Sequence, residues 1–177
     1  LRQRSRKVGL VTTDINHLIE QMKSATLDWE SSRPHEVGVA LAAIQINQPW
    51  RIVIVRNNFD DKSDRSFSVL INPEVVKFEG EVEEDYEGCL SVTDVYGKVP
   101  RYNKVRVRAL DEKGREIRIR AEGFLARVLQ HEIDHINGKM FIDHIKDDQK
   151  AFYRITQDGK LVELPYEEIR TSDIFRD

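Results

Sequence analysis

The segment Gly123–Ile136 constrains the chain more than any other, because its apolar residues recur at the spacing of a buried α-helix. Asn137-Gly138 follows, a pair that commonly ends a helix on a left-handed glycine. The predicted inner face carries Phe124, Leu125, Val128, Leu129, His131, Glu132, His135 and Ile136. The predicted outer face carries Arg127, Gln130, Asp134 and Asn137. Two histidines and a glutamate are therefore expected inside the protein.

These inner polar residues form the pattern H-E-x-x-H between His131 and His135. Histidines one helical turn apart can each place a ring nitrogen about 2.0–2.1 Å from one divalent metal ion. Glu132 can then reach a water molecule at that ion. The structural alternative is a pair of buried, hydrogen-bonded histidines, but a glutamate buried between them would be costly. The pattern therefore predicts a metal site.

The identity of the third ligand decides the class of metalloenzyme. The metzincin pattern requires a histidine where this chain has Phe141, and the chain therefore does not match that class of proteases. A thermolysin-like site needs a further carboxylate downstream, and Ala151–Gln157 offers none. Cys89 is the remaining soft candidate, since a thiolate suits zinc or iron. A lone cysteine is often only core packing, but beside H-E-x-x-H we interpret it as a ligand.

The composition describes a soluble chain of 177 residues with 28 Lys+Arg against 31 Asp+Glu and one cysteine. One core can form at this size without disulfides. No apolar run approaches the roughly 20 residues of a membrane span. The near-balanced charge argues against nucleic acid as the main partner. We therefore predict a cytoplasmic protein, although Leu1 in place of Met leaves a removed leader, and thus an organelle, open.

Secondary-structure signals predict a long N-terminal helix over Asp14–Trp29, with Thr12 or Thr13 as its N-cap. Turns are expected at Glu112–Gly114 and at Asp158-Gly159. Predicted strands are Ile52–Arg56, Phe67–Ile71, Val75–Glu83, Val105–Ala109 and Glu116–Ala121. The fold class is therefore α+β, with antiparallel or mixed β-sheets around the metal-binding helix.

Two charged segments are predicted to be solvated. Glu79–Glu87 contains six acidic residues, which favours an exposed edge strand or loop. A basic cluster near the start favours an exposed terminus rather than a docking site. That cluster comprises Arg2, Arg4, Arg6 and Lys7.

Three motifs in order resemble those of peptide deformylases over nearly the whole chain. The first spans Gly38–Gln45, with Gly38, Ala42, Ala43 and Gln45 matching. The second is Glu87-Gly88-Cys89-Leu90-Ser91, and the third is Gln130–His135 followed by Gly138. The resemblance implies one catalytic domain over residues 1–177, a metallohydrolase that removes the formyl group of N-formylmethionyl nascent peptides and releases formate.

The resemblance also implies a role for each site residue. The metal ligands would be Cys89, His131 and His135, holding one divalent ion, Fe²⁺ or Zn²⁺. Glu132 would act as general acid and base. Gln45 and the backbone N–H of Leu90 would meet the charge that develops on the formyl oxygen.

Other polar residues are expected to have structural roles. Glu87 and Arg101 are candidates for an ion pair behind the cysteine loop. Asp134 is expected to anchor the helix by a salt bridge rather than to touch the metal. The remaining histidines are expected to be structural or exposed: His17, His35 and His144.

Two positions depart from the family pattern. Ala40 stands where the family has a second glycine beside the bound peptide, and its methyl group is expected to narrow the groove. Tyr96 stands where a substrate-side arginine is usual, so affinity and specificity are affected more than chemistry. Residues 161–177 carry five acids against two arginines, which leaves docking to ribosomes through a basic terminal helix unsupported.

Rival interpretations follow from these departures. One is a deformylase-like protein that binds metal and peptide with weak or no turnover. A small metallopeptidase is the second, and endopeptidase activity on unformylated peptides would support it. The third is a purely structural metal site, which would need a fourth protein ligand that the sequence does not offer.

Overall fold

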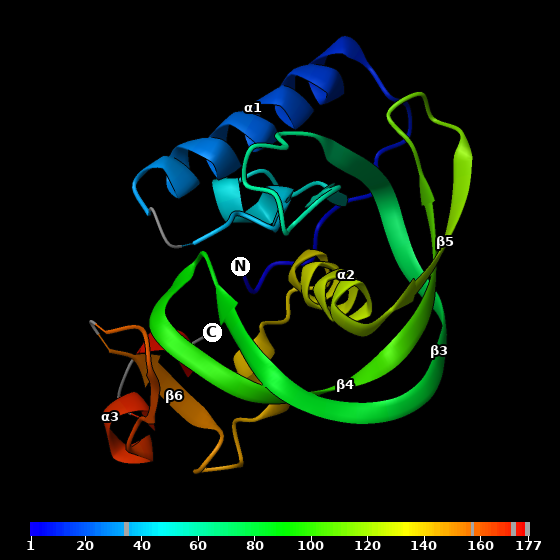
Figure 1. Cartoon of the computed structure of the whole chain (residues 1–177). Helices are drawn as coiled ribbons and strands as arrows, with labels where there is room; N and C mark the ends of the chain where they lie inside the picture. The colour runs from blue at the N-terminus through cyan, green and yellow to red at the C-terminus, as the bar shows by residue number, and fades with distance from the viewer. Residues whose placement is uncertain (34–35, 157, 171–172, 176–177) are drawn as a thin grey trace.

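A long, bent β-hairpin surrounds a central helix in the computed structural model, which describes residues 1–33, 36–156, 158–170 and 173–175 (Figure 1). The hairpin consists of β3 (Phe67–Cys89) and β4 (Val92–Leu110), and the helix is α2 (Gly123–Ile136). The other elements are α1 (Thr13–Ser31), β1 (Ala40–Ala42), the 3-10 helix η1 (Ala43–Ile46), β2 (Ile52–Arg56), β5 (Glu116–Glu122), η2 (Phe141–His144), β6 (Phe152–Ile155), β7 (Leu161–Glu163), α3 (Tyr166–Arg170) and η3 (Asp173–Phe175).

Seven strands form one sheet in the order β1-β2-β3-β4-β6-β7, with β5 paired to β4. Every pair of strands that the structure describes is antiparallel. Long antiparallel strands can curve, and in Figure 1 the hairpin sweeps around α2 while α1 lies across the other side of β1 and β2. The predicted α+β class and the antiparallel pairing are confirmed.

The long N-terminal helix is confirmed and extends slightly beyond the predicted range. The Thr12 hydroxyl accepts a hydrogen bond from the Ile15 N–H at 3.4 Å, which caps the first turn of α1. β2 matches its prediction and is buried on both faces. Its residues Ile52 and Ile54 pack toward α1, whereas Val53 and Val55 pack toward α2. Successive side chains of a strand point to opposite faces of the sheet, so β2 contacts α1 on one face and α2 on the other.

The middle strands are longer than predicted. Phe67–Ile71 and Val75–Glu83 belong to one strand, β3, and the prediction of two strands is wrong. Pro73 lies in a register shift between Ile71 and Glu74, where its missing N–H interrupts no regular ladder. Val105–Ala109 is likewise only the last part of β4. Both strands contain many exposed polar residues, so the hydrophobic pattern did not reveal their full length.

The central helix has the predicted bounds, and Gly138 follows it with φ +78°. A side chain at Gly138 would also collide with the Arg2 carbonyl oxygen. The predicted faces of the helix are partly wrong. Phe124 is 53% exposed, whereas Arg127 and Gln130 are buried. The polar pair is buried because the β-hairpin supplies carbonyl acceptors for both side chains.

The predicted turns join antiparallel neighbours as expected, Glu112–Gly114 between β4 and β5 and Asp158-Gly159 between β6 and β7. The acidic segment Glu79–Glu87 is exposed over most of its length, but Glu87 is buried, so the prediction fails at that residue. None of the helices in the described part of the chain has the length and apolar character needed to cross a membrane.

Candidate metal centre

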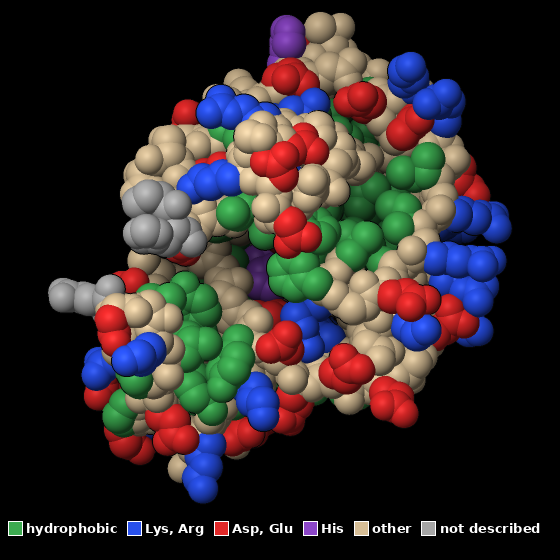
Figure 2. Space-filling model, in the orientation of Figure 1, with side chains coloured by type: hydrophobic (Ala, Val, Ile, Leu, Met, Phe, Trp, Pro, Cys, Tyr) green, Lys and Arg blue, Asp and Glu red, His purple; other side chains and the backbone are tan. Residues whose placement is uncertain are grey.

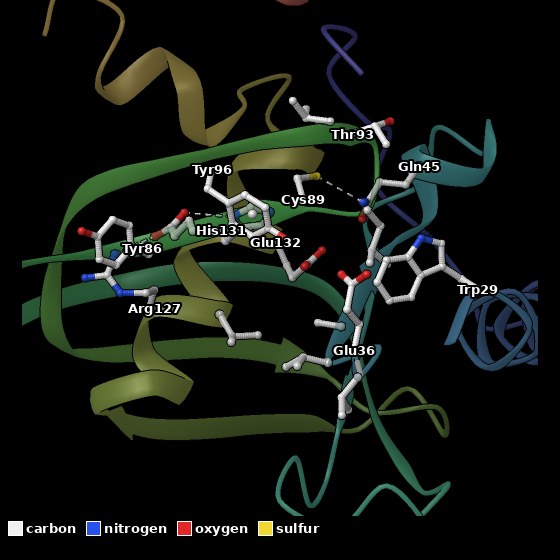
Figure 3. Close-up of a pocket in the computed structure, with 18 of the residues that line it drawn as sticks. Trp29, Glu36, Gln45, Tyr86, Cys89, Thr93, Tyr96, Arg127, His131 and Glu132 are labelled. Carbon is white, nitrogen blue, oxygen red and sulfur yellow. Dashed lines mark hydrogen bonds and ion pairs between the residues drawn. The ribbon is translucent and has the colours of Figure 1, made fainter. Parts of the chain in front are cut away.

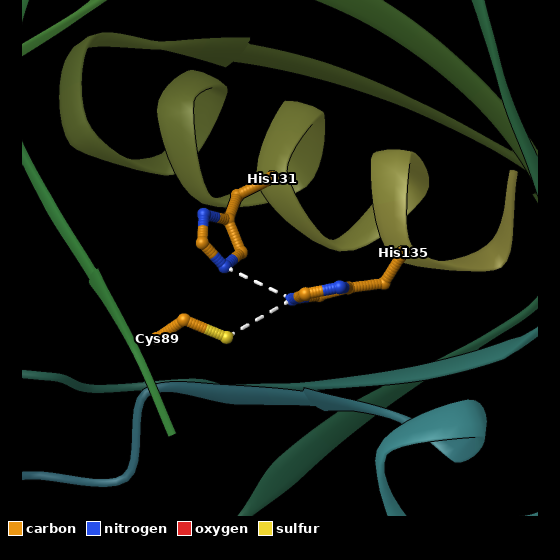
Figure 4. A group of neighbouring side chains, drawn as sticks. All are labelled: Cys89, His131 and His135. Atoms are coloured by element: carbon orange, nitrogen blue, oxygen red, sulfur yellow. Dashed lines mark hydrogen bonds between the residues drawn. The ribbon is translucent and has the colours of Figure 1, made fainter. Parts of the chain in front are cut away.

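Three potential metal ligands lie close together although they come from two separate elements: Cys89, His131 and His135 (Figure 4). Cys89 ends β3 immediately before the two-residue turn to β4, and both histidines lie one turn apart on α2. The Cys89 Sγ is 3.3 Å from His135 Nε2, and the two Nε2 atoms are 3.2 Å apart. All three donor atoms lie within 4.8 Å of one another.

These separations fit a single small cation. Zinc–nitrogen distances of about 2.0–2.1 Å and a zinc–sulfur distance of about 2.3 Å place tetrahedral donors roughly 3.3–3.6 Å apart. One thiolate and two imidazoles also form a donor set that suits zinc or iron. Among the residues that the structure describes, this is the one group of three such side chains found close enough together to hold an ion. The donors therefore fit a metal with a remaining open position.

Glu132 lies beside these donors with an unused carboxylate oxygen. The side chain is buried, at 5% exposure, and its Oε2 has no hydrogen-bond partner in the described part of the chain. Burial raises the pKa of Glu132 to about 7. A carboxylate that titrates near neutrality can both accept and return a proton. An unpaired buried oxygen in a polar cavity is also a position for a water or a substrate group.

Glu87 connects the cysteine-bearing strand to the metal-binding helix. Its Oε2 lies 2.9 Å from His131 Nδ1, and Arg101 donates to both of its oxygens at 2.9 and 3.0 Å. Arg127 donates to Oε1 at 2.8 Å. Although burial opposes ionisation, the hydrogen bonds from His131 and Arg101 hold the pKa of Glu87 well below its usual range. A carboxylate that accepts from Nδ1 leaves Nε2 of His131 free to bind a metal.

The predicted ion pair of Glu87 with Arg101 is thus present, and Arg101 extends it. The same guanidinium donates to Asp134 at 2.6 Å, and His144 Nε2 lies 2.7 Å from that carboxylate. Asp134 therefore anchors α2, as expected, and is absent from the group of donor atoms. His17 is exposed, and His35 lies outside the described residues.

Gln45 presents its amide nitrogen to this centre from η1. Its Oε1 accepts from the Ala42 N–H at 2.8 Å, which fixes the orientation of the amide. The Nε2 atom then donates to Ser91 Oγ at 3.2 Å and lies 3.7 Å from Cys89 Sγ. Leu90 lies in the adjacent turn and lines the same cavity. The structure brings all six predicted site residues together.

The cavity over these residues has a volume of about 300 Å³ and opens to solvent. In the space-filling view a histidine is visible at the bottom of the hollow (Figure 2). Cys89, His131 and Glu132 form its inner end, while Trp29 and Tyr86 lie toward the sides (Figure 3). A site of this kind can hold a short extended ligand whose reacting atom lies against the metal donors.

Comparisons with known proteins identify this arrangement. Residues 1–151 match the family model described as Polypeptide deformylase. A peptide deformylase of Thermomicrobium roseum is 40% identical over 150 residues, which cover 83% of this chain and 81% of the relative. The chain belongs to the peptide deformylase family. The family expected from the three motifs is confirmed, and so is its enzyme class, a metallohydrolase that removes formyl groups from peptides.

Two further relatives agree. A peptide deformylase of Halothermothrix orenii is 43% identical over 145 residues, covering 82% of this chain and 86% of the relative. The solved peptide deformylase of Synechococcus elongatus, in complex with actinonin, is 34% identical with a TM-score of 0.72, covering 81% of this chain and 72% of that one. The fold expectation is confirmed by this likeness.

The two departures of this peptide deformylase both line its cavity. Ala40 is buried in β1. The ring of Tyr96 covers Gly88, where an added methyl carbon would lie 2.6 Å from Tyr96 Cε1. The Tyr96 ring thus leaves room only for a glycine at position 88, and the two residues form the wall of the cavity next to Cys89.

Sequence reasoning missed Arg127, which was predicted to lie on the outer face. In this peptide deformylase it donates to Glu87 and to the carbonyl oxygens of Val99 and Glu83, at 2.7 and 2.8 Å for the two carbonyls. Its partners all belong to the distant β-hairpin. No local spacing marks such a residue, so only the tertiary arrangement could identify it.

Proposed function

We propose that this peptide deformylase removes the formyl group from N-formylmethionyl peptides, with Cys89, His131 and His135 as the ligands of one divalent ion. The observation that carries the proposal is the convergence of three metal-binding atoms beside the unpaired carboxylate oxygen of Glu132. The His135 Nε2 atom lies 3.2 Å from His131 Nε2 and 3.3 Å from Cys89 Sγ. The donor set fits Fe²⁺ or Zn²⁺. When bound, either ion supplies a Lewis acid and lowers the pKa of water.

Glu132 moves the proton in the proposed reaction. Its carboxylate accepts a proton from the attacking water, whose oxygen forms a bond to the formyl carbon. The carbon–nitrogen bond then breaks, and Glu132 returns the proton to the leaving amine nitrogen. Formate and a free N-terminal methionine are the products. The buried position and the raised pKa of Glu132 support both steps.

Gln45 and Leu90 stabilise the charge that develops on the formyl oxygen. The hydrogen bond from Ala42 to Gln45 Oε1 holds the amide so that Nε2 faces the site. The backbone N–H of Leu90 is the proposed second donor. Removing one such donor typically raises the barrier by about 2.7–4 kcal/mol. The hydrogen bond from Ala42 orients the Gln45 amide without a substrate, so this donor requires little reorganisation during the reaction.

The wider setting follows from the same assignment. We propose that residues 1–177 act as one catalytic domain on nascent peptides in the cytoplasm. Membrane attachment and direct action on nucleic acid are not required for this chemistry. The acidic character of residues 161–177 gives no support for ribosome docking through that segment.

Anaerobic formate release from a formyl-Met tripeptide tests the proposal, using protein loaded separately with Fe²⁺ and with Zn²⁺. We expect formate and the deformylated peptide in equal amounts with at least one metal, and inhibition by actinonin, the ligand of the Synechococcus elongatus structure. Absence of formate with both metals would reject the proposal and favour a binding protein without turnover. Cleavage of an unformylated peptide would instead indicate a metallopeptidase.

A further inference from the structure

A second groove lies outside the catalytic cavity, at the C-terminal end of α2. Its volume is about 740 Å³, and none of the residues that line it lines the catalytic cavity. The N-terminal segment forms one side, because the Ser5 N–H donates to the Ile136 carbonyl at 3.0 Å. β3 and β4 form the other side. This groove has no role in the proposed reaction.

Positive charge in the groove lacks a matching negative charge. Four of its cations make no ion pair with any carboxylate in the described part of the chain: Arg4, Lys7, Arg51 and Lys139. The two acids that line it are already paired, Glu74 with Arg108 at 3.1 Å and Asp134 with Arg101 at 2.6 Å. The groove therefore presents a net positive surface to a ligand.

Arg51 is the most constrained of these cations. Its guanidinium donates only to neutral acceptors: Asn137 Oδ1 at 2.8 Å, the Pro73 carbonyl at 3.1 Å and the Ile136 carbonyl at 3.5 Å. Its buried Nε has no partner among the described residues. Partial burial and the nearby charge of Arg4 lower the pKa of Arg51. The charge of Glu74 acts in the opposite direction, but Arg51 forms no ion pair with a carboxylate among the described residues. A half-buried guanidinium held by neutral acceptors is suited to bind an anion.

Exposed aromatic side chains line the same groove as the cations. Phe78 on β3 is 51% exposed and Tyr102 on β4 is 40% exposed, and their ring centroids are 5.2 Å apart. Val82, at 54% exposure, is the cross-strand partner of Tyr102. Exposure of these apolar side chains to water does not stabilise the chain, and such exposed apolar groups often mark a binding site. A groove that combines aromatic rings with cations has the features that bind single-stranded nucleic acid, because the bases stack on the rings and the phosphates pair with the cations.

We infer that this groove binds a single-stranded segment of RNA, with Arg4, Lys7, Arg51 and Lys139 on the phosphates and Phe78 and Tyr102 against the bases. A duplex hides its base faces and would not use the aromatic pair. An acidic peptide would use the cations alone. The near-balanced charge of the whole chain does not oppose this inference, because the excess is local to one groove. The inference is independent of the proposed function.

Fluorescence anisotropy of the metal-loaded full chain with a labelled single-stranded oligouridine of about 12 nucleotides tests the inference. Four phosphate contacts predict that log K falls with log salt at a slope of roughly −3. Replacing two exposed cations in K7A/K139A should reduce that slope by about 1.4. Phe78→Ala should weaken binding at least about fivefold. Formate release and the melting temperature should stay unchanged in these variants.

The matched control is K113A/K150A, which removes the same charge from two exposed lysines outside the groove. It should bind RNA like the parent. Equal losses in the control and groove variants would indicate diffuse attraction and overturn the inference. So would the absence of binding at low salt. Unchanged affinity in both Phe78→Ala and Tyr102→Ala, with full displacement of RNA by polyglutamate, would assign the groove to an acidic protein instead.

Discussion

Glu132 unites burial, a free carboxylate oxygen and a raised pKa within reach of the metal donors. The Glu132→Gln variant keeps the shape of the side chain but removes its ability to accept a proton. We expect it to retain the metal and to lose about 10²–10⁴-fold in kcat. Formate release measured alongside metal content tests this. Activity within tenfold of the parent would contradict the role of Glu132 as the base.

Gln45 offers a cleaner test of charge stabilisation, because its two amide atoms have separate partners. Gln45→Glu keeps an oxygen to accept from the Ala42 N–H but replaces the Nε2 donor with a second acceptor. We expect kcat to fall about 10²–10³-fold with little change in KM. Steady-state kinetics on a formyl-Met tripeptide measure both constants. A rise in KM alone would instead indicate a role in peptide binding.

At the scale of elements, Glu87 joins β3, β4 and α2 through one carboxylate. Glu87→Gln leaves Arg127 buried without its anion and leaves Arg101 with Asp134 alone, so we expect a loss of about 3–5 kcal/mol in unfolding free energy. Because His131 also loses its partner, metal affinity should fall about 10–100-fold. Denaturant unfolding and a metal titration check the two effects.

The matched control for Glu87 is Glu81→Gln, which changes the same residue type on the exposed part of β3. It should leave both the stability and the metal affinity close to those of the parent. If Glu87→Gln behaves like this control, the buried network has no part in holding the metal-binding helix.

Helices and strands with a clear hydrophobic pattern in their own sequence were predictable, whereas those stabilised by contacts with distant segments were not. α2 and β2 have their predicted bounds, because helical spacing and a short β-branched run are local signals. The length of β3 was missed, since pairing with β4 stabilises residues that look like a solvated loop. Gln130 was placed outside, because its acceptor, the Tyr102 carbonyl, lies on another element.

At the scale of the whole molecule, the sequence predicted which residues lie together around the cavity better than it predicted the fold between them. H-E-x-x-H identified the two histidines and Glu132 from spacing alone. Cys89 was predicted as the remaining soft ligand, whereas the role of Gln45 required the resemblance. Local patterns could not show that Cys89 lies beside His131, because 42 positions in the sequence separate the two residues. The folded hairpin brings the cysteine to the helix.

Metal binding should stabilise the entire chain, because a site built from β3 and α2 exists only in the folded state. At a metal concentration near 100 times Kd, the gain is about 2.7 kcal/mol, which corresponds to a rise of roughly 5–10 °C in Tm. Thermal unfolding of metal-free and reloaded protein measures it. Cys89→Ser should reduce the rise, and an equal rise in this variant would remove Cys89 from the ligand set.

X-ray absorption spectroscopy of the zinc-loaded protein tests the central claim most directly, because it counts the atoms bound to the metal. We predict one sulfur at about 2.3 Å, two imidazole nitrogens at about 2.0–2.1 Å and one further light atom that exchanges with solvent. The sulfur should vanish in Cys89→Ser. The account would be contradicted if no sulfur were bound to the metal in the parent protein, or if a fourth side chain occupied the remaining coordination position.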